Sequence, residues 1–113
     1  MKILLIAITT LISSLTLAHG DHPPKVAACT KECTQEQVEK AVPAALDFLM
    51  AKDGLDKSWK SAKVEKVEKK QFKKSMEWVA TLVDEKQADK TKQRLYVFIT
   101  LKGTLNGANY SGE

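Results

Sequence analysis

Residues 94–111 have the sequence RLYVFITLKGTLNGANYS, which predicts a β-hairpin. Its first half alternates between two faces, with Leu95, Val97, Ile99 and Leu101 on one and Tyr96 and Phe98 on the other. A period of two built from β-branched and aromatic residues is typical of a strand in a pleated sheet. A tight turn at Lys102 and Gly103 and a second strand are expected to complete the hairpin.

The sequence before the hairpin predicts two more strands. Residues 77–83 (EWVATLV) are apolar on both faces, which suits a central strand. Residues 84–93 contain one apolar residue, Ala88, and are expected to form a solvated loop. The lysine-rich segment 62–74 is ambiguous, because it has no glycine or proline that would exclude a helix. We favour an exposed edge strand from about Val64 to Phe72, whose lysines would oppose pairing with other chains.

An amphipathic helix is expected to begin at Thr34. The sequence TQEQ at residues 34–37 is a capping box, in which Thr34 and Gln37 satisfy each other's free backbone donors. Apolar residues then recur three or four positions apart, at Val38, Ala41, Val42, Ala45, Leu46, Leu49 and Met50. Pro43 is expected to kink or split this helix, and Gly54 to end it. Trp59 follows in a short turn that we expect to pack against the helix.

This order of elements predicts an α+β fold, in which one N-terminal helix, kinked at Pro43, packs on a four-stranded antiparallel sheet. Residues 34–113 would form a single domain, since neither an internal repeat nor a linker divides them. We expect the protein to be a monomer.

The N-terminus resembles a secretory signal peptide. After Lys2, residues 3–17 carry no charge, and this run is too short to anchor the chain in a bilayer. Small residues before and at Ala18 predict cleavage there, which leaves 95 of the 113 residues and lowers the net charge from +4 to +3. That charge is too small to imply a polyanionic partner. The expected location is the periplasm or the extracellular medium; lipidation at Cys29 is a less favoured alternative.

Residues 19–33 are expected to form a mobile arm, and they hold every histidine and cysteine of the chain: His19, His22, Cys29 and Cys33. Cleavage after Ala18 would give His19 a free α-amine beside its imidazole. Such nitrogen ligands suit copper or zinc, and the thiolates would add affinity for Cu(I) or Zn(II). The C-x₃-C spacing is weakly diagnostic, however, and exported cysteines usually pair. We therefore favour a Cys29–Cys33 disulfide over metal ligation, and thiol redox activity ranks third.

The chain resembles a family of small exported bacterial proteins of uncharacterised function. The resemblance runs from the signal through residues 18–22 (AHGDH) and continues at 55–59 (LDKSW), 77–79 (EWV), 95–98 (LYVF) and 108–112 (ANYSG). It implies a PepSY-like or cystatin-like domain over residues 34–113, and it implies no catalytic site. Cys29 and Cys33 are not part of the family pattern, so any role for them would be particular to this protein.

Two further surfaces are candidates for binding. Eight lysines between residues 57 and 74 could meet an anionic surface, but glutamates interrupt them and no arginine or stacking aromatic residue is interleaved. A solvated face that blocks aggregation is favoured, and a nucleic-acid partner is not expected. Tyr96, Phe98 and Tyr110 would share one face of the hairpin, where they could bind a peptide or an apolar ligand.

An enzyme is not expected. The predicted domain holds no histidine, so a Ser–His or Cys–His pair would have to recruit the arm. Glycine-rich phosphate loops, H-E-x-x-H motifs and paired C-x₂-C motifs do not occur. The sequence predicts a secreted or periplasmic binding or accessory protein, not integral to the membrane, whose partner is an unknown periplasmic protein or small ligand. The alternative is a periplasmic copper- or zinc-binding protein that uses the arm.

Overall fold

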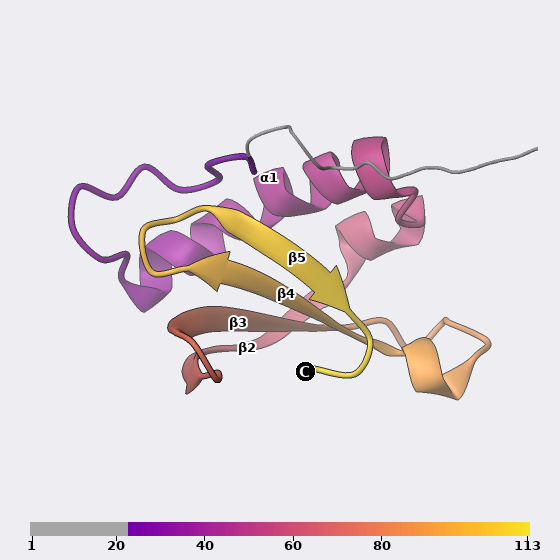
Figure 1. The fold of residues 1–113 in the computed structure, drawn as a ribbon. Coiled ribbons are helices and arrows are strands. Elements are labelled where there is room, and N and C mark those ends of the chain that lie inside the picture. Colours follow the sequence, from indigo (N-terminus) through magenta and orange to yellow (C-terminus); the bar gives the residue numbers. More distant parts are fainter. Residues whose placement is uncertain (1–22) are drawn as a thin grey trace, which may run out of the picture.

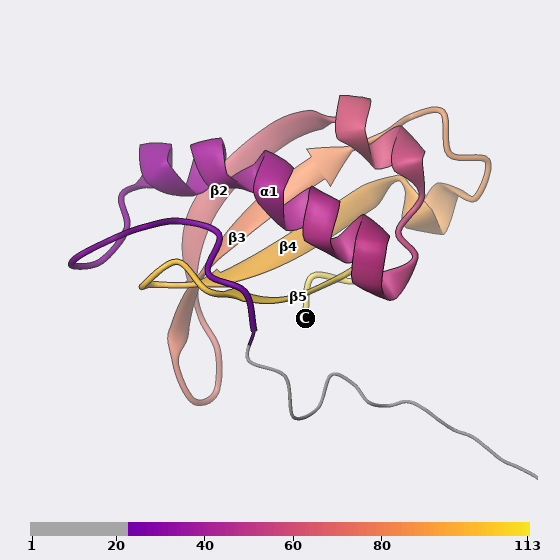
Figure 2. The ribbon, with the colours of Figure 1, turned by 90° about the horizontal axis from the view of Figure 1, so that it is seen from above.

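The computed structural model describes residues 23–113, which form two layers, a helix and a sheet. The elements in chain order are α1 (Gln35–Asp53), the 3₁₀ turn η2 (Lys57–Ser61), β2 (Lys63–Gln71), β3 (Met76–Val83), the 3₁₀ turn η3 (Lys90–Lys92), β4 (Arg94–Thr100) and β5 (Leu105–Asn109). The sheet is antiparallel with the order β2-β3-β4-β5, and α1 lies across one face of it (Figures 1 and 2). The predicted α+β fold is confirmed.

Helix α1 has the predicted caps. The Thr34 side chain accepts a hydrogen bond from the Gln37 amide at 3.1 Å, and the Gln37 side chain accepts one from the Thr34 amide at 2.9 Å. The helix ends at Gly54, whose φ of 72° is left-handed. It runs through Pro43 as one element, so the split that we considered does not occur, and the kink stays a prediction. Pro43 has no amide hydrogen, so the Glu39 carbonyl four residues earlier lacks its helical donor. Both residues are exposed, so water can donate a hydrogen bond to this carbonyl instead.

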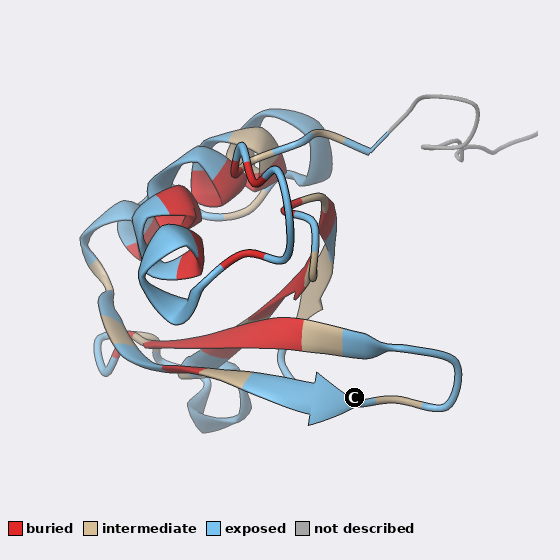
Figure 3. Ribbon diagram, turned by 90° about the vertical axis from the view of Figure 1, so that its left-hand side faces the viewer, coloured by how far each residue is buried: buried red, intermediate tan, exposed pale blue. Residues whose placement is uncertain are grey.

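The core lies between α1 and the facing side of the sheet, as the buried segments in Figure 3 show. Trp59 of η2 closes one end of it and is 1% exposed, as the sequence predicted. The apolar stripe of α1 meets alternate residues of β3 and β4: Trp78, Ala80, Leu82, Leu95, Val97 and Ile99. Their burial against the helix is the main source of stability for a domain of this size.

The segment that was ambiguous in sequence is a strand. Strand β2 pairs with β3 alone and so forms one edge of the sheet, while β3 is central, as predicted. Lysine and glutamate make up six of the nine residues of β2. Most of its side chains are exposed, so charge is displayed along the whole edge.

The connection 84–93 is more ordered than the predicted loop. It contains η3, and the side chain of Asp84 is buried. The Asp84 carboxylate accepts hydrogen bonds from the Gln87 side chain at 2.9 Å and from the Lys86 amide at 3.1 Å. The bond from Gln87 is the largest cause that lowers the pKa of Asp84. Polar side chains thus organise a segment that has almost no apolar residue.

The hairpin of β4 and β5 contains a β-bulge. Leu105 pairs with Ile99 and Gly107 pairs with Phe98, so Asn106 is one extra residue in β5. Gly107 adopts a φ of 144° there, in the range that favours glycine. Beyond the bulge the alternation of faces is shifted by one residue.

The bulge moves Tyr110 to the helix side of the sheet. Its ring lies 6.3 Å from that of Trp59, measured between centroids. The prediction that Tyr110 shares a face with Tyr96 and Phe98 is therefore wrong. An unbroken alternation would have placed the three together, and the extra residue in β5 reverses the side of everything after it.

Candidate functional site

The described part of the predicted arm is packed against the hairpin. The Val26 and Ala27 amides both donate to the Gly103 carbonyl, at 2.8 and 3.1 Å, and the Leu105 amide donates to the Pro24 carbonyl at 2.9 Å. Lys25 forms an isolated antiparallel bridge with Thr104. We expected residues 19–33 to form a mobile arm, and residues 19–22 lie outside the described residues. Residues 24–33 lie against the β4–β5 turn, and the mobility of the arm stays a prediction.

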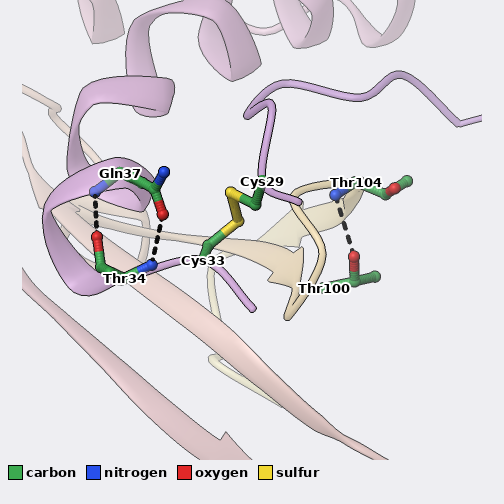
Figure 4. Close-up of a disulfide and its surroundings, with 6 residues drawn as sticks. All are labelled: Cys29, Cys33, Thr34, Gln37, Thr100 and Thr104. Atoms are coloured by element: carbon green, nitrogen blue, oxygen red, sulfur yellow. Dashed lines mark hydrogen bonds between the residues drawn. A yellow bond between two sulfur atoms is a disulfide. The ribbon is translucent and has the colours of Figure 1, made fainter. Parts of the chain in front are cut away.

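Cys29 and Cys33 form a disulfide beside this turn (Figure 4). The sulfur atoms are 2.06 Å apart, and both residues are buried, at 6% and 3% exposure. The Cys33 amide donates to the Leu101 carbonyl at 2.7 Å, which ties the five-residue ring to the end of β4. The cysteines are therefore part of the core.

The metal site suggested by the sequence is only partly within the described residues. His19 and His22 lie outside them. Cys29 and Cys33 are oxidised, so neither offers a thiolate as a ligand. Among residues 23–113, the His, Cys, Asp and Glu side chains form no group of three or more able to hold a metal ion. Metal ligation by the histidines stays a prediction.

The lysines of β2 take part in several exposed ion pairs. Lys66 lies 3.3 Å from Glu68, and Lys69 lies 3.5 Å from Glu32. Arg94 forms a bidentate pair with Glu65, with nitrogen–oxygen distances of 3.2 and 3.1 Å. The hydrogen bond that Arg94 donates to the Glu65 carboxylate is the largest cause that lowers the pKa of Glu65. This mixture of signs is typical of a solvated edge rather than of a continuous anion-binding surface.

The sheet face opposite α1 carries the most site-like arrangement of the described residues. We call it the open face; it presents Glu77, Val79, Thr81, Tyr96, Phe98, Asn106, Gly107 and Asn109. The last residues of the chain fold back below it (Figure 1). Asn109 fixes this return, because its side chain accepts from the Gly112 amide at 2.8 Å and donates to the Glu113 carbonyl at 3.3 Å.

A shallow pocket of about 400 Å³ lies on the open face at its β5 edge. It is lined by Phe72, Glu77, Phe98, Asn106, Gly107, Ala108, Asn109 and Glu113. Phe72 comes from the loop after β2 and packs edge-to-face on Phe98, with ring centroids 5.7 Å apart and an interplanar angle of 78°. The pocket therefore has an aromatic side and a polar rim of amides and carboxylates.

The rim is acidic. Asn106 donates to both carboxylate oxygens of Glu77, at 3.1 and 2.9 Å, and so holds this carboxylate over the end of β4. Neither Glu77 nor Glu113 forms an ion pair with another described residue, and no lining residue is cationic. Lys70 faces Glu77 across β2 and β3, but the carboxylate accepts its hydrogen bonds from Asn106. The neutral side-chain amide of Asn106, rather than a lysine, thus supplies the hydrogen-bond donor for the Glu77 carboxylate.

Sequence reasoning found Phe98 and missed the rest of this pocket. Phe72 and Glu77 flank the β2–β3 loop, and only the three-dimensional pairing of the strands brings them to β5. One local signal was available. An asparagine–glycine pair inside a strand, Asn106-Gly107, is typical of a bulge, and the bulge places both residues on the open face.

Comparisons with known proteins give a family and little else. Within residues 23–113, no helix has the length and apolar character needed to cross a membrane. Neither a curated protein nor a solved structure matches the chain. A family model matches residues 1–113, the whole sequence, and the chain therefore belongs to DUF6488, a family of unknown function.

Proposed function

We propose that this protein is an exported, non-enzymatic binding or accessory module that holds its partner in the pocket on the open face. The observation that carries the proposal is an aromatic pair, the half-buried Phe72 and the buried Phe98, that lines a pocket on the sheet face that α1 does not cover. An aromatic pair bordered by convergent polar groups is typical of a ligand site.

The geometry supports binding rather than chemistry. The pocket polar groups are two amides and two carboxylates, and Glu77 is already bonded to Asn106. These groups can orient a ligand by hydrogen bonds and charge. Nucleophilic catalysis would need an activated serine, cysteine or lysine beside a base, and the pocket lining holds none of these three residues.

Export and a periplasmic location are part of the proposal. They are supported by the uncharged run after Lys2, by the small residues at Ala18 and by the Cys29–Cys33 disulfide, because disulfides persist in oxidising compartments. The helix on a four-stranded antiparallel sheet is also compatible with the PepSY-like domain that the sequence resembles. Copper or zinc binding through His19 and His22 is the alternative function, and it is tested separately below.

Ligand-detected and protein-detected NMR tests the proposal. A library of small aromatic, amine and short peptide compounds is titrated into the ¹⁵N-labelled protein, and we expect the amide shifts caused by bound compounds to cluster at the pocket lining. Phe72→Ala removes half of the aromatic pair and should abolish these shifts. Phe48→Ala is the matched control, because Phe48 is also half-buried but lies on α1.

Two results would contradict the proposal. One is a library in which no compound shifts the pocket amides at millimolar concentration. The other is binding that Phe72→Ala leaves unchanged, which would place the site elsewhere. Circular dichroism of both variants establishes that they remain folded.

A further inference from the structure

We infer that the ligand is an extended peptide that adds to the sheet along β5 and places a lysine or arginine side chain in the pocket. This inference rests on the proposed function and specifies its partner. Three independent features of the described residues lead to it: an uncharged sheet edge, an acidic pocket beside that edge, and an open path between the two.

The two edges of the sheet differ in charge. Strand β2 carries charge at six of nine positions, which opposes the approach of another strand. Strand β5 has the sequence LNGAN, with no charged residue, and pairs with β4 alone. An uncharged edge strand offers its outward amides and carbonyls to an added strand.

The chain itself already uses the beginning of this edge. Lys25 bridges Thr104 in antiparallel fashion, and the Leu105 amide bonds to the Pro24 carbonyl. Among residues 23–113 this pairing does not continue past Leu105, so the outward side of residues 106–109 has no strand partner. The edge therefore accepts an extended segment, and no described residue pairs with its outward side beyond Leu105.

The pocket selects for positive charge. Glu77 and Glu113 are its only charged lining residues. The aromatic rings of Phe72 and Phe98 add an apolar surface for the methylene stem of a lysine or arginine, and their faces attract a cation. A chain whose own net charge is positive thus presents a local acidic site.

Gly107 leaves the path from the edge to the pocket open. It lies on the open face opposite Phe98, and a Cβ atom built on it would meet no atom within 4 Å. A side chain from an added strand can therefore cross above Gly107 to reach Phe98 and Glu77. Side chains that alternate with it would point to the other side of the sheet.

Lys70 sets a limit on the strength of this selection. It faces Glu77 across β2 and β3 on the open face, so its charge opposes a bound cation. Both groups are solvated, and the net preference should be moderate. Replacing Lys70 should increase the preference for a basic side chain, and replacing Glu77 should remove it.

The test uses a blocked peptide of sequence Thr-Val-Thr-Lys-Thr-Val-Thr and two analogues with norleucine or glutamate in place of the lysine. Dissociation constants come from NMR titrations of the amides of residues 106–109. We expect the lysine peptide to bind about threefold to tenfold tighter than the norleucine peptide. Glu77→Gln should bring this ratio close to one, and Lys70→Gln should raise it.

Strand addition is tested with N-methylated peptides. Alternate amides of an edge-paired strand face the sheet and the solvent, so methylating one alternate set should abolish binding while methylating the other leaves it intact. Loss from both sets, or from neither, would overturn the inference. A ratio of one in the unmodified protein, or a ratio that Glu77→Gln does not change, would also overturn it.

These experiments distinguish a failure of the peptide inference from a failure of the proposed function. If small compounds bind in a manner that depends on Phe72 while all three peptides fail to bind, the pocket is a small-ligand site and the peptide inference is wrong. If neither compounds nor peptides reach the pocket, both are wrong.

Discussion

Replacing Gly103 by alanine should detach the N-terminal segment from the hairpin. Gly103 lies at the β4–β5 turn with a φ of 98°, and its carbonyl oxygen accepts the amides of Val26 and Ala27. A Cβ atom at this position would overlap the carbonyl oxygen of Ala27 and lie 3.0 Å from its carbonyl carbon. A backbone carbonyl cannot rotate away as a flexible side chain can, so the whole segment must move.

The expected loss of stability has two parts. An alanine at a left-handed φ costs about 1–2 kcal/mol. Moving the segment breaks two backbone hydrogen bonds, each worth about 0.5–1.5 kcal/mol, so the total is about 2–5 kcal/mol. Gly54→Ala is the matched control, because Gly54 has a φ of 72° and a Cβ atom there would meet nothing within 4 Å. Its cost should be the backbone part alone.

Urea unfolding followed by tryptophan fluorescence measures both variants, since Trp59 and Trp78 are buried. Hydrogen exchange then locates the change, and the amides of Val26 and Ala27 should lose protection in Gly103→Ala only. Equal destabilisation by the two variants, with both amides still protected, would refute the idea that the close approach to Ala27 requires a glycine.

Three further predictions concern the disulfide, the pH dependence and the arm. Cys29→Ser with Cys33→Ser should lower the free energy of unfolding by about 2 kcal/mol, since the ring is small, and calorimetry that finds no change would contradict this. Hydrogen bonds, chiefly from Gln87, lower the pKa of Asp84 in the folded state. The ionised carboxylate therefore stabilises the fold above the unfolded-state pKa of about 4, and this stabilisation is lost as the pH falls below that value. Asp84→Asn should therefore flatten the fall in stability measured by urea unfolding between pH 5 and pH 2, and an unchanged slope would count against it. Native mass spectrometry of protein with a His19 N-terminus should show one Cu(II) per chain that is lost in the His19→Ala, His22→Ala variant, whereas a metal-free wild-type spectrum would rule out the histidine site.

Local signals in the sequence predicted most of the fold. The capping box at Thr34, the left-handed Gly54 and the alternation of β4 depend on neighbouring residues only, and all three are confirmed. The identity of β2 was harder, because its lysines recur at every third position and its apolar residues fit neither the helical nor the strand period cleanly. Its strand structure is fixed by the ladder with β3, which is a tertiary contact.

The candidate site could not be predicted because it depends on one inserted residue. If Asn106 were an ordinary paired residue of the strand, the unbroken alternation from Leu105 would place Tyr110 on the open face. With the insertion, Asn109 takes a place there and Tyr110 packs on Trp59. Phe72 and Glu77 are likewise distant from β5 in sequence. Only the register of the complete sheet brings them together.

Pro24 limits the pairing between the described N-terminal segment and β5. Pro24 accepts a hydrogen bond from Leu105 but has no amide to donate, and Pro23 before it has none either. Only alternate amides of an antiparallel strand face its partner, so Pro24 removes the donor that would face Leu105, whereas the position of Pro23 faces away from β5. Among residues 23–113 the pairing ends at this point. Replacing both prolines by alanine restores the donor that faces Leu105 and releases the fixed φ of both residues. We expect stronger exchange protection of the 106–109 amides and weaker binding of the lysine peptide, measured in the same titration. Lys25→Ala is the control, because its amide is unaltered. Unchanged protection in the double variant would show that the prolines do not limit pairing along this edge.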